Sequence, residues 1–352
     1  MKKGSRSIAL FLALVSLLLV PGCASKKDSS GAPQGLAYFT YFDTVSYVYS
    51  YAGDSAELFN EHSADVSALL KKYHQLFDIY NEYSGINNLC TLNKNAGGDF
   101  IEVDPELIDF LKYTKEMYAL TDGNMNVMFG AVLSIWHNCR AAAEEDPSQA
   151  TVPSQEELES ANEHCNISLL EIDEANSAVR ISDPLASIDV GAIGKGYATE
   201  KAAQLLKAEG VTGYVLNIGG NVRMIGHKPD ADGWVTGITD PNNSGDGGFS
   251  LRLVLNDTSC VTSGYYERFY RVKGVRYHHI IDKDTLFPAE GFASVSIVTK
   301  DSGVADALST ALFCVSKEEG MKILENFPGT EVIWIYPDGA IEKTPGLENS
   351  IL

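Results

Sequence analysis

The sequence predicts an α+β fold in one large domain. Predicted strands come in runs that helices interrupt, without the steady strand–helix alternation of a doubly wound parallel sheet. Composition gives no break that would divide the chain. The most polar interior stretch, residues 141–155, ends in the capping-box pattern Ser154-x-x-Glu157, which begins a short polar helix. We therefore interpret this stretch as a surface excursion within the domain.

Helices are predicted where apolar residues recur every three or four positions. The segment 57–80 carries Leu69, Leu70, Tyr73, Leu76 and Phe77 at this spacing. A helix after Lys195 has Ala198, Ala202, Leu205 and Leu206 on one face and stops at Gly210. The other expected helices cover 105–120, 127–136 and 304–315.

Strands are predicted where polar and apolar residues alternate or where β-branched runs end in glycine or asparagine. The segment 41–51 alternates in this way, and 167–188 is expected to form short strands. Further strands are expected over 214–218, 234–239, 249–255 and 331–336.

The N-terminus has the pattern of a secretory signal. Lys2, Lys3 and Arg6 precede an apolar run over 8–20, which is shorter than the roughly 20 residues that a spanning helix needs. Cys23 follows this run and resembles the lipidated first residue of a bacterial lipoprotein. A plain cleaved signal with a chance cysteine is the alternative. We expect a signal peptide over 1–22, a lipidated tether over 23–35 and a folded domain over 36–352.

The charge of the chain excludes one class of partner. The net charge is −20, and removal of the basic signal makes the mature chain still more acidic. Nucleic-acid binding is therefore not expected, because it needs a basic face. Five of the six cysteines follow Cys23, and because this number is odd, at least one free thiol is expected. The sequence contains no Cys-x-x-Cys motif, so a zinc or thiol-redox site is not indicated.

A glycine-rich turn over 187–196 carries Lys195 into a helix start. Free backbone N–H groups, the positive end of the helix dipole and a lysine suit a phosphate or another anion. An ordinary strand-to-helix connection with a surface lysine has the same pattern. The turn matches neither the Rossmann nor the P-loop motif, so neither fold is predicted.

Asp306 and Thr310 lie four residues apart on a predicted helix, so both side chains point to one face. A carboxylate and a hydroxyl are hard oxygen ligands that suit Mg²⁺. The alternative is an acid placed in the first turn by the helix dipole, with Thr310 bonded back to a carbonyl.

Three further segments carry polar groups at strand ends. Asn217-Ile-Gly-Gly-Asn221 ends a strand in a double glycine, which either lets the backbone approach a ligand or makes a tight turn. In Tyr277-His-His-Ile-Ile-Asp282, one histidine is expected to face the core and one to face outward, as a general base, a phosphate ligand or a structural residue. Thr262-Ser-Gly-Tyr-Tyr-Glu-Arg268 combines hydroxyls with an arginine.

Taken together and in this order, these segments resemble the ApbE family of FAD:protein FMN transferases. The resemblance runs from about residue 37 to 345. It rests on Phe42-Asp-Thr, Asp78-Ile-Tyr80, Thr121-Asp-Gly-Asn-Met-Asn126 with Trp136, Asp189-x-Gly-x-x-x-Lys195, Asn217-Ile-Gly-Gly, Thr262-Ser-Gly-x-Tyr-x-Arg268, His278-His-Ile-Ile-Asp282 and Asp306-Ala-x-x-Thr310. It implies mostly antiparallel sheets with packed helices.

The resemblance also implies an activity and its residues. Such an enzyme binds FAD with Mg²⁺, transfers the FMN half to a Ser or Thr hydroxyl of a partner protein and releases AMP. Mg²⁺ would be held by Asp306, Thr310 and the backbone carbonyl of Ala192. His279 matches the histidine implicated in activity. The residues expected to contact FAD are Phe42, Tyr80, Asn124, Met125, Asn126, Lys195, Gly219, Gly220, Thr262 and His279.

Departures from the family pattern affect the FAD contacts and none of the metal ligands. The family often has Asp at Asn126, Met-Gly-Thr at 42–44 and Asp-Pro-x-Thr-Gly at 282–286. Two other functions stay open: an FAD pyrophosphatase that uses water as acceptor, and a lipoprotein that binds flavin without chemistry.

The partners follow from the resemblance and the signal. They are FAD, an extracytoplasmic acceptor flavoprotein with an exposed Ser or Thr flavinylation motif, and the cell membrane through the lipid anchor.

Overall fold

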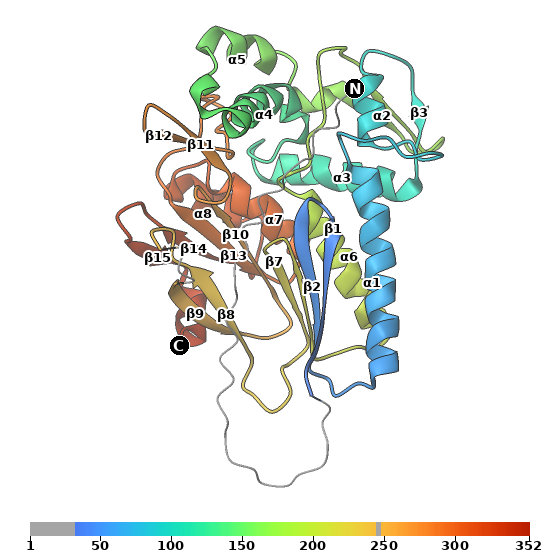
Figure 1. Ribbon diagram of the computed structural model, residues 1–352, viewed down its shortest axis with the longest axis vertical. Helices are drawn as coiled ribbons and strands as arrows, with labels where there is room; N and C mark the ends of the chain where they lie inside the picture. The colour runs from blue at the N-terminus through green and yellow to red at the C-terminus, as the bar shows by residue number, and fades with distance from the viewer. Residues whose placement is uncertain (1–31, 244–247) are drawn as a thin grey trace.

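The computed structural model describes residues 32–243 and 248–352 (Figure 1). The predicted signal peptide and Cys23 lie outside these residues. An eight-stranded sheet, in which neighbouring strands pair antiparallel, forms the centre of the fold. In spatial order its strands are β1 (Gln34–Tyr41), β2 (Thr44–Ser50), β6 (Tyr214–Ile218), β7 (Asn221–Ile225), β10 (Ser259–Gly264), β13 (Ser294–Thr299), β14 (Glu331–Ile335) and β15 (Ile341–Lys343).

Helices cover one face of this sheet and a β-hairpin covers part of the other. On the helical face lie α1 (Ala56–Phe77), α6 (Gly194–Ala208) and α7 (Ser302–Ala311), with α6 in contact with both neighbours (Figure 1). The hairpin of β8 (Trp234–Thr239) and β9 (Phe249–Leu255) packs on the opposite face, where Trp234 and Leu253 join a second apolar core with Met224. The α+β fold with antiparallel sheets is confirmed.

Smaller elements form a cap above one end of the sheet, at the top of Figure 1. Residues of α4, α5 and β11 share a third apolar core, which includes Trp136 and Tyr270. The cap elements are α2 (Leu89–Lys94), α3 (Pro105–Leu120), α4 (Gly130–Glu145), α5 (Gln155–Asn162), the sheet β3 (Ile101–Glu102), β5 (Ala178–Ile181) and β4 (Leu170–Asp173), and the hairpin β11 (Phe269–Val272) and β12 (Val275–His278). The remaining elements are α8 (Lys317–Leu324) and the 3₁₀ turns η1 (Val127–Phe129), η2 (Pro147–Gln149), η3 (Ile167–Leu169) and η5 (Pro345–Ser350).

Several predicted elements are confirmed with small changes at their ends. The helix over 105–120 and the strands over 214–218, 234–239 and 249–255 have the expected bounds. The helix expected over 57–80 ends at Phe77 because Asp78 is extended and its Oδ1 accepts from the backbone N–H of Tyr80. The helix expected over 304–315 begins at Ser302, since the Asp301 side chain caps it.

The strand expected over 41–51 begins only at Thr44, because Phe42 and Asp43 form a turn. Before this turn comes β1, which begins at Gln34 inside the predicted tether and pairs with β2. In the described part of the chain all five cysteines are free thiols, and no helix is long and apolar enough to cross a membrane.

Candidate functional site

The first part of the site is the contact between the start of α6 and α7. Asp306 is 5% exposed, and its Oδ2 accepts a hydrogen bond of 2.7 Å from the backbone N–H of Gly196. Lys195 Nζ lies 4.0 Å from the same oxygen and donates to the carbonyl of Gly191 at 3.2 Å. The carboxylate therefore sits at the positive end of α6, where the helix dipole stabilises it.

Oxygen donors collect around Asp306. Thr310 follows one helical turn later, and its hydroxyl lies 3.4 Å from that of Ser263. The loop before α6 brings Ala192 to the same cavity. Within the described ranges, no three His, Cys, Asp or Glu side chains form a group that could hold a metal. A cation here would thus take carboxylate, hydroxyl and carbonyl oxygens, which is a donor set that suits Mg²⁺.

Two tight hairpin turns form the next part. Phe42 and Asp43 connect β1 to β2 with φ of 54° and 50°, and Gly219 and Gly220 connect β6 to β7 with φ of 56° and 91°. Positive φ at both positions is typical of a type I′ turn. A Cβ on Gly219 would lie 2.6 Å from a side-chain atom of Thr44, so only glycine allows the two turns to lie this close.

The loop after α1 presents Tyr80, whose side chain is 57% exposed. Its hydroxyl lies 3.1 Å from Nδ1 of His137 on α4. Although Tyr80 is more than half exposed, the protein atoms around its ring, followed by the charge of Asp189, raise its pKa. Burial alone would raise the pKa of Asp78 as well, but hydrogen bonds from Asn81, Tyr83 and the backbone outweigh it and hold that pKa below its usual value.

The segment 124–126 lines the cavity, but its side chains are engaged inside the protein. Met125 is buried, and Asn124 Nδ2 donates to the Thr121 carbonyl at 2.9 Å. Asn126 caps η1 through the backbone N–H of Met128 and donates to the carbonyl of Cys165 at 2.8 Å. Thr262 also lines the cavity, with its hydroxyl 2.7 Å from that of Ser296.

The two adjacent histidines differ in their surroundings, as predicted. His278 is buried: its Nε2 donates to the Ala289 carbonyl at 3.0 Å, and its Nδ1 accepts from the backbone N–H of Ile280 at 3.3 Å. His279 is more accessible, and its Nδ1 lies 3.2 Å from the Arg268 carbonyl. Because a carbonyl only accepts, Nδ1 carries the proton and Nε2 carries the lone pair. Protein atoms packed around the ring, and then Arg268, hold the pKa of His279 below its usual value although the residue is only half-buried, so its ring is neutral near pH 7.

The cavity also contains residues to which the sequence assigned no role. His137 and Arg140 on α4, Asp189 before α6, Glu267 and Arg268 all line it. The sequence could have indicated the two residues on α4, since His137 and Arg140 recur with Leu133 at helical intervals on one face.

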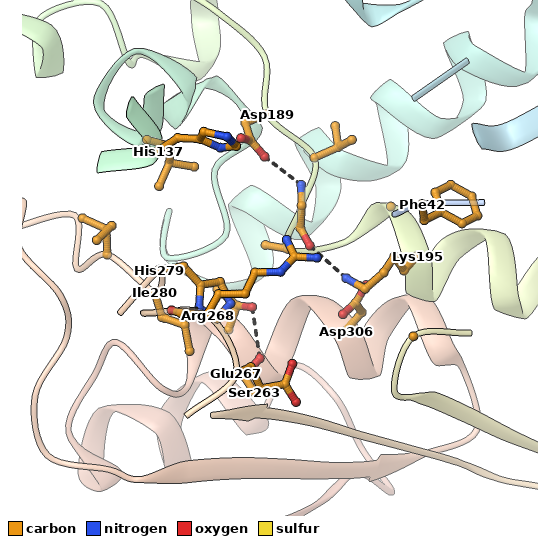
Figure 2. Close-up of a pocket in the computed structure, with 18 of the residues that line it drawn as sticks. Phe42, His137, Asp189, Lys195, Ser263, Glu267, Arg268, His279, Ile280 and Asp306 are labelled. Carbon is orange, nitrogen blue, oxygen red and sulfur yellow. Dashed lines mark hydrogen bonds and ion pairs between the residues drawn. The ribbon is translucent and has the colours of Figure 1, made fainter. Parts of the chain in front are cut away.

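These parts surround one cavity of about 750 Å³ between the cap and the end of the large sheet. Figure 2 shows Arg268 in its middle, with His279 on one side and Lys195 with Asp306 on the other. Every predicted site residue within the described chain lines it: Phe42, Tyr80, Asn124, Met125, Asn126, Ala192, Lys195, Gly219, Gly220, Thr262, His279, Asp306 and Thr310. The predicted lipidation residue, Cys23, is outside the described residues.

Fold and site together define an antiparallel α+β protein with a pocket of the size of a small cofactor, lined by both acidic and basic side chains. Residues 42–334 match the model of the ApbE family, and the chain belongs to this family.

Individual relatives agree with the family match. The chain is 32% identical over 277 residues to the FAD:protein FMN transferase of Treponema pallidum, covering 75% of this chain and 74% of that protein. It is 28% identical over 321 residues to the enzyme of the same name from Vibrio cholerae, covering 89% and 90%. The crystal structure of an ApbE protein from Thermotoga maritima superposes with a TM-score of 0.77 at 29% identity, over 90% of this chain and 99% of that chain.

Proposed function

We propose that this protein is an FAD:protein FMN transferase that depends on Mg²⁺. It transfers the FMN half of FAD to a Ser or Thr hydroxyl of a partner flavoprotein and releases AMP. The observation that carries the proposal is that the predicted FAD and Mg²⁺ residues line one cavity. In it, Asp306 of α7 lies beside Lys195 at the start of α6. The names of the relatives support the same reaction.

The metal would be held by Asp306, Thr310 and the carbonyl of Ala192, whose oxygens fit a hard cation. When bound there, Mg²⁺ would act as a Lewis acid and would stabilise the negative charge that develops on the leaving AMP. Lys195 adds a positive charge beside this site.

The reaction is phosphoryl transfer, so positioning and charge stabilisation supply most of the catalysis. The acceptor hydroxyl oxygen forms a bond to the phosphorus of the FMN phosphate. The bond from that phosphorus to the bridging oxygen breaks, and AMP leaves with the bridging oxygen. Lys195, which lies beside Asp306 at the start of α6, would place a positive charge near the phosphates.

His279 is the proposed acceptor of the hydroxyl proton. Its Nδ1–H donates to the Arg268 carbonyl, so Nε2 keeps the lone pair that a general base needs. The low pKa keeps the ring neutral at working pH.

The test uses the purified full-length chain in mild detergent with FAD, Mg²⁺ and a purified acceptor domain that carries a flavinylation motif. A mass gain of one FMN on the acceptor, with AMP release and loss of both in EDTA, is the expected result. AMP release without a mass gain on any acceptor would indicate an FAD pyrophosphatase instead. FAD that binds and stays intact would indicate a flavin-binding lipoprotein.

We also propose that Cys23 anchors the protein to the extracytoplasmic face of the cell membrane, where the acceptor flavoprotein would be found. The mature wild-type chain is expected to carry a lipid on Cys23 that intact mass detects, and the Cys23→Ser variant is expected to lack it. Cys139→Ser is the matched control, since Cys139 lies within the folded domain, and it should keep the lipid. A wild-type chain without any lipid, or a Cys23→Ser chain with the wild-type lipid mass, would contradict the anchor.

A further inference from the structure

Two guanidinium groups of this chain line the same cavity, and within the described residues neither forms an ion pair with a buried carboxylate. Arg140 projects from α4, and Arg268 comes from the loop between β10 and β11. The Arg140 side chain is only 16% exposed, and its ion pair is with Glu144 at 3.6 Å, whose side chain is 65% exposed. Across residues 32–243 and 248–352, Arg268 has no carboxylate within 4.0 Å of its side-chain nitrogens.

The two arginines act on each other and on the neighbouring His137. Burial and then Arg268 lower the pKa of Arg140, although Glu144, Tyr80 and Asp189 act against this. Burial and then Arg140 lower the pKa of His137, with Arg268 acting in the same direction and Asp189 and Glu144 in the other. Asp189 and Glu267 line the same cavity and offset part of this positive charge.

Because the Arg140 side chain is largely buried, a second guanidinium in the same cavity makes its charge costlier, and a bound anion would relieve that cost. Arginine is suited to this task, since its planar fork donates two parallel hydrogen bonds to phosphate oxygens. The cavity therefore contains a candidate phosphate site besides the one at Asp306 and Lys195.

The second candidate phosphate site lies close to the proposed general base, because Arg268 is hydrogen-bonded to His279. Its carbonyl accepts from both the backbone N–H of His279 at 3.1 Å and the ring Nδ1–H at 3.2 Å, so the arginine and the histidine are held as one unit. In Figure 2 its side chain lies between His279 and the Lys195–Asp306 pair. An anion at the Arg268 guanidinium would thus lie in the cavity between His279 and the Lys195–Asp306 pair (Figure 2).

We infer that Arg140 and Arg268 form a two-arginine clamp that binds the flavin-side phosphate of FAD, the phosphate that lies next to His279. The inference rests on the proposed function for the identity of the ligand. It adds two side chains that contact the substrate, one of which, Arg140, lies outside the motifs that carry the family resemblance.

The test measures binding and needs no acceptor. Riboflavin has no phosphate, FMN has one and FAD has two, and each is titrated by flavin fluorescence into the full-length chain in detergent with EDTA, where Mg²⁺-dependent turnover is absent. The variants are Arg140→Gln, Arg268→Gln and Arg268→Lys. Arg271→Gln is the matched control, because Arg271 is exposed and lies outside the cavity.

Arg140→Gln and Arg268→Gln are each expected to weaken FAD and FMN binding about tenfold or more, and to change riboflavin binding by less than about twofold. Arg268→Lys should lose less FAD and FMN affinity than Arg268→Gln, because lysine keeps the positive charge but lacks the paired donors of the guanidinium. The clamp would be overturned if riboflavin binding weakened as much as FAD and FMN binding. It would also be overturned if FAD and FMN affinities stayed unchanged, or if only FAD affinity fell. An effect limited to the acceptor's KM would overturn it in favour of an acidic acceptor side chain.

The two proposals can fail separately. Wild-type protein that binds none of the three flavins would overturn the proposed function and the clamp together. Wild-type protein that binds FAD, with both glutamine variants unchanged, would overturn the clamp alone. Arg268→Gln keeps the inference testable if Arg140→Gln fails to fold, since Arg268 is exposed within the cavity.

Discussion

The backbone N–H of Gly196 donates a hydrogen bond of 2.7 Å to Oδ2 of Asp306. This bond joins the start of α6 to the first turns of α7, and it fixes one oxygen of the carboxylate assigned to Mg²⁺. A Cβ on Gly196 would lie 2.3 Å from the Ser302 carbonyl and 2.4 Å from Asp306 Cβ. The geometry of the proposed metal site therefore depends on a glycine that touches no substrate.

Gly196→Ala is expected to lower the free energy of unfolding by about 1–3 kcal/mol, because the two backbones must move apart. It should also weaken activation by Mg²⁺, since Asp306 moves with α7. Gly320→Ala is the control: it is also a helical glycine, but its Cβ would meet nothing closer than 3.4 Å. Chemical denaturation of both variants checks this, and equal stability of Gly196→Ala and wild type would refute the close-packing argument.

Asp306→Ala is expected to abolish the transferase activity together with its dependence on Mg²⁺. The substitution removes the carboxylate ligand and leaves Thr310 and a carbonyl, which hold a divalent cation poorly. Asp65→Ala, at an exposed position of α1, should behave as wild type. Titration of initial rate against Mg²⁺ measures the effect. Activity that survives in Asp306→Ala would show that the metal lies elsewhere.

His279→Asn should reduce the transfer rate about 10²-fold or more if His279 accepts the hydroxyl proton. Its effect on FAD affinity should be small, since the proton transfer concerns the transition state. His227→Asn serves as a control at an exposed histidine outside the cavity. Separate kcat and KM values are needed; near-normal turnover of a correctly folded His279→Asn would remove this residue from the mechanism.

Much of the fold could be predicted from local patterns. The helix over Pro105–Leu120 follows from its N-terminal proline and apolar spacing, and the strand Tyr214–Ile218 follows from alternation that ends in Gly219. The site residues could be predicted because glycines, Lys195 and the Asp306–Thr310 pair occur at spacings with a chemical meaning.

Other features depend on tertiary contacts that local patterns do not record. The strand β13 is buried along its whole length, so it has no alternation to reveal it. The strand β1 is assigned through its pairing with β2, which no local pattern specifies. Arg140 has an ordinary helical context, and only the packing of α4 above the cavity brings it near Arg268.

Acid should destabilise the protein through His278. Burial, opposed in part by its hydrogen bond to Ala289, lowers the pKa of this histidine to about 4. An unfolded histidine titrates near 6.5, so between these values the unfolded state binds more protons and stability falls as the pH falls. From pH 7 to pH 5 the contribution of His278 amounts to about 2 kcal/mol.

The free energy of unfolding measured by urea at several pH values checks this expectation. His278→Gln should lower stability at pH 7 and flatten the slope between pH 7 and 5, whereas His227→Gln should keep the wild-type slope. A His278→Gln protein with an unchanged slope would mean that other groups cause the acid sensitivity.

A buried ion pair between Glu200 and Arg223 contacts the start of α7. Glu200 Oε2 accepts from Arg223 Nε at 3.0 Å and from the backbone N–H of Ser302 at 3.1 Å, and the two side chains are 11% and 3% exposed. Glu200→Ala would leave the buried Arg223 charge with only the more exposed Asp257, at 3.5 Å, and would leave the Ser302 N–H without its acceptor. We therefore expect a loss of about 3–5 kcal/mol in the free energy of unfolding.

The exposed pair between Lys112 and Glu174, at 2.6 Å, is the matched control, and Glu174→Ala should barely change stability. The double variant Glu200→Leu with Arg223→Met removes both charges together, so it should recover part of the stability that Glu200→Ala loses. Because Glu200 also holds the Ser302 N–H, the double variant should still bind Mg²⁺ less tightly than wild type. Full recovery of both stability and Mg²⁺ activation would show that Glu200 has no part in placing α7.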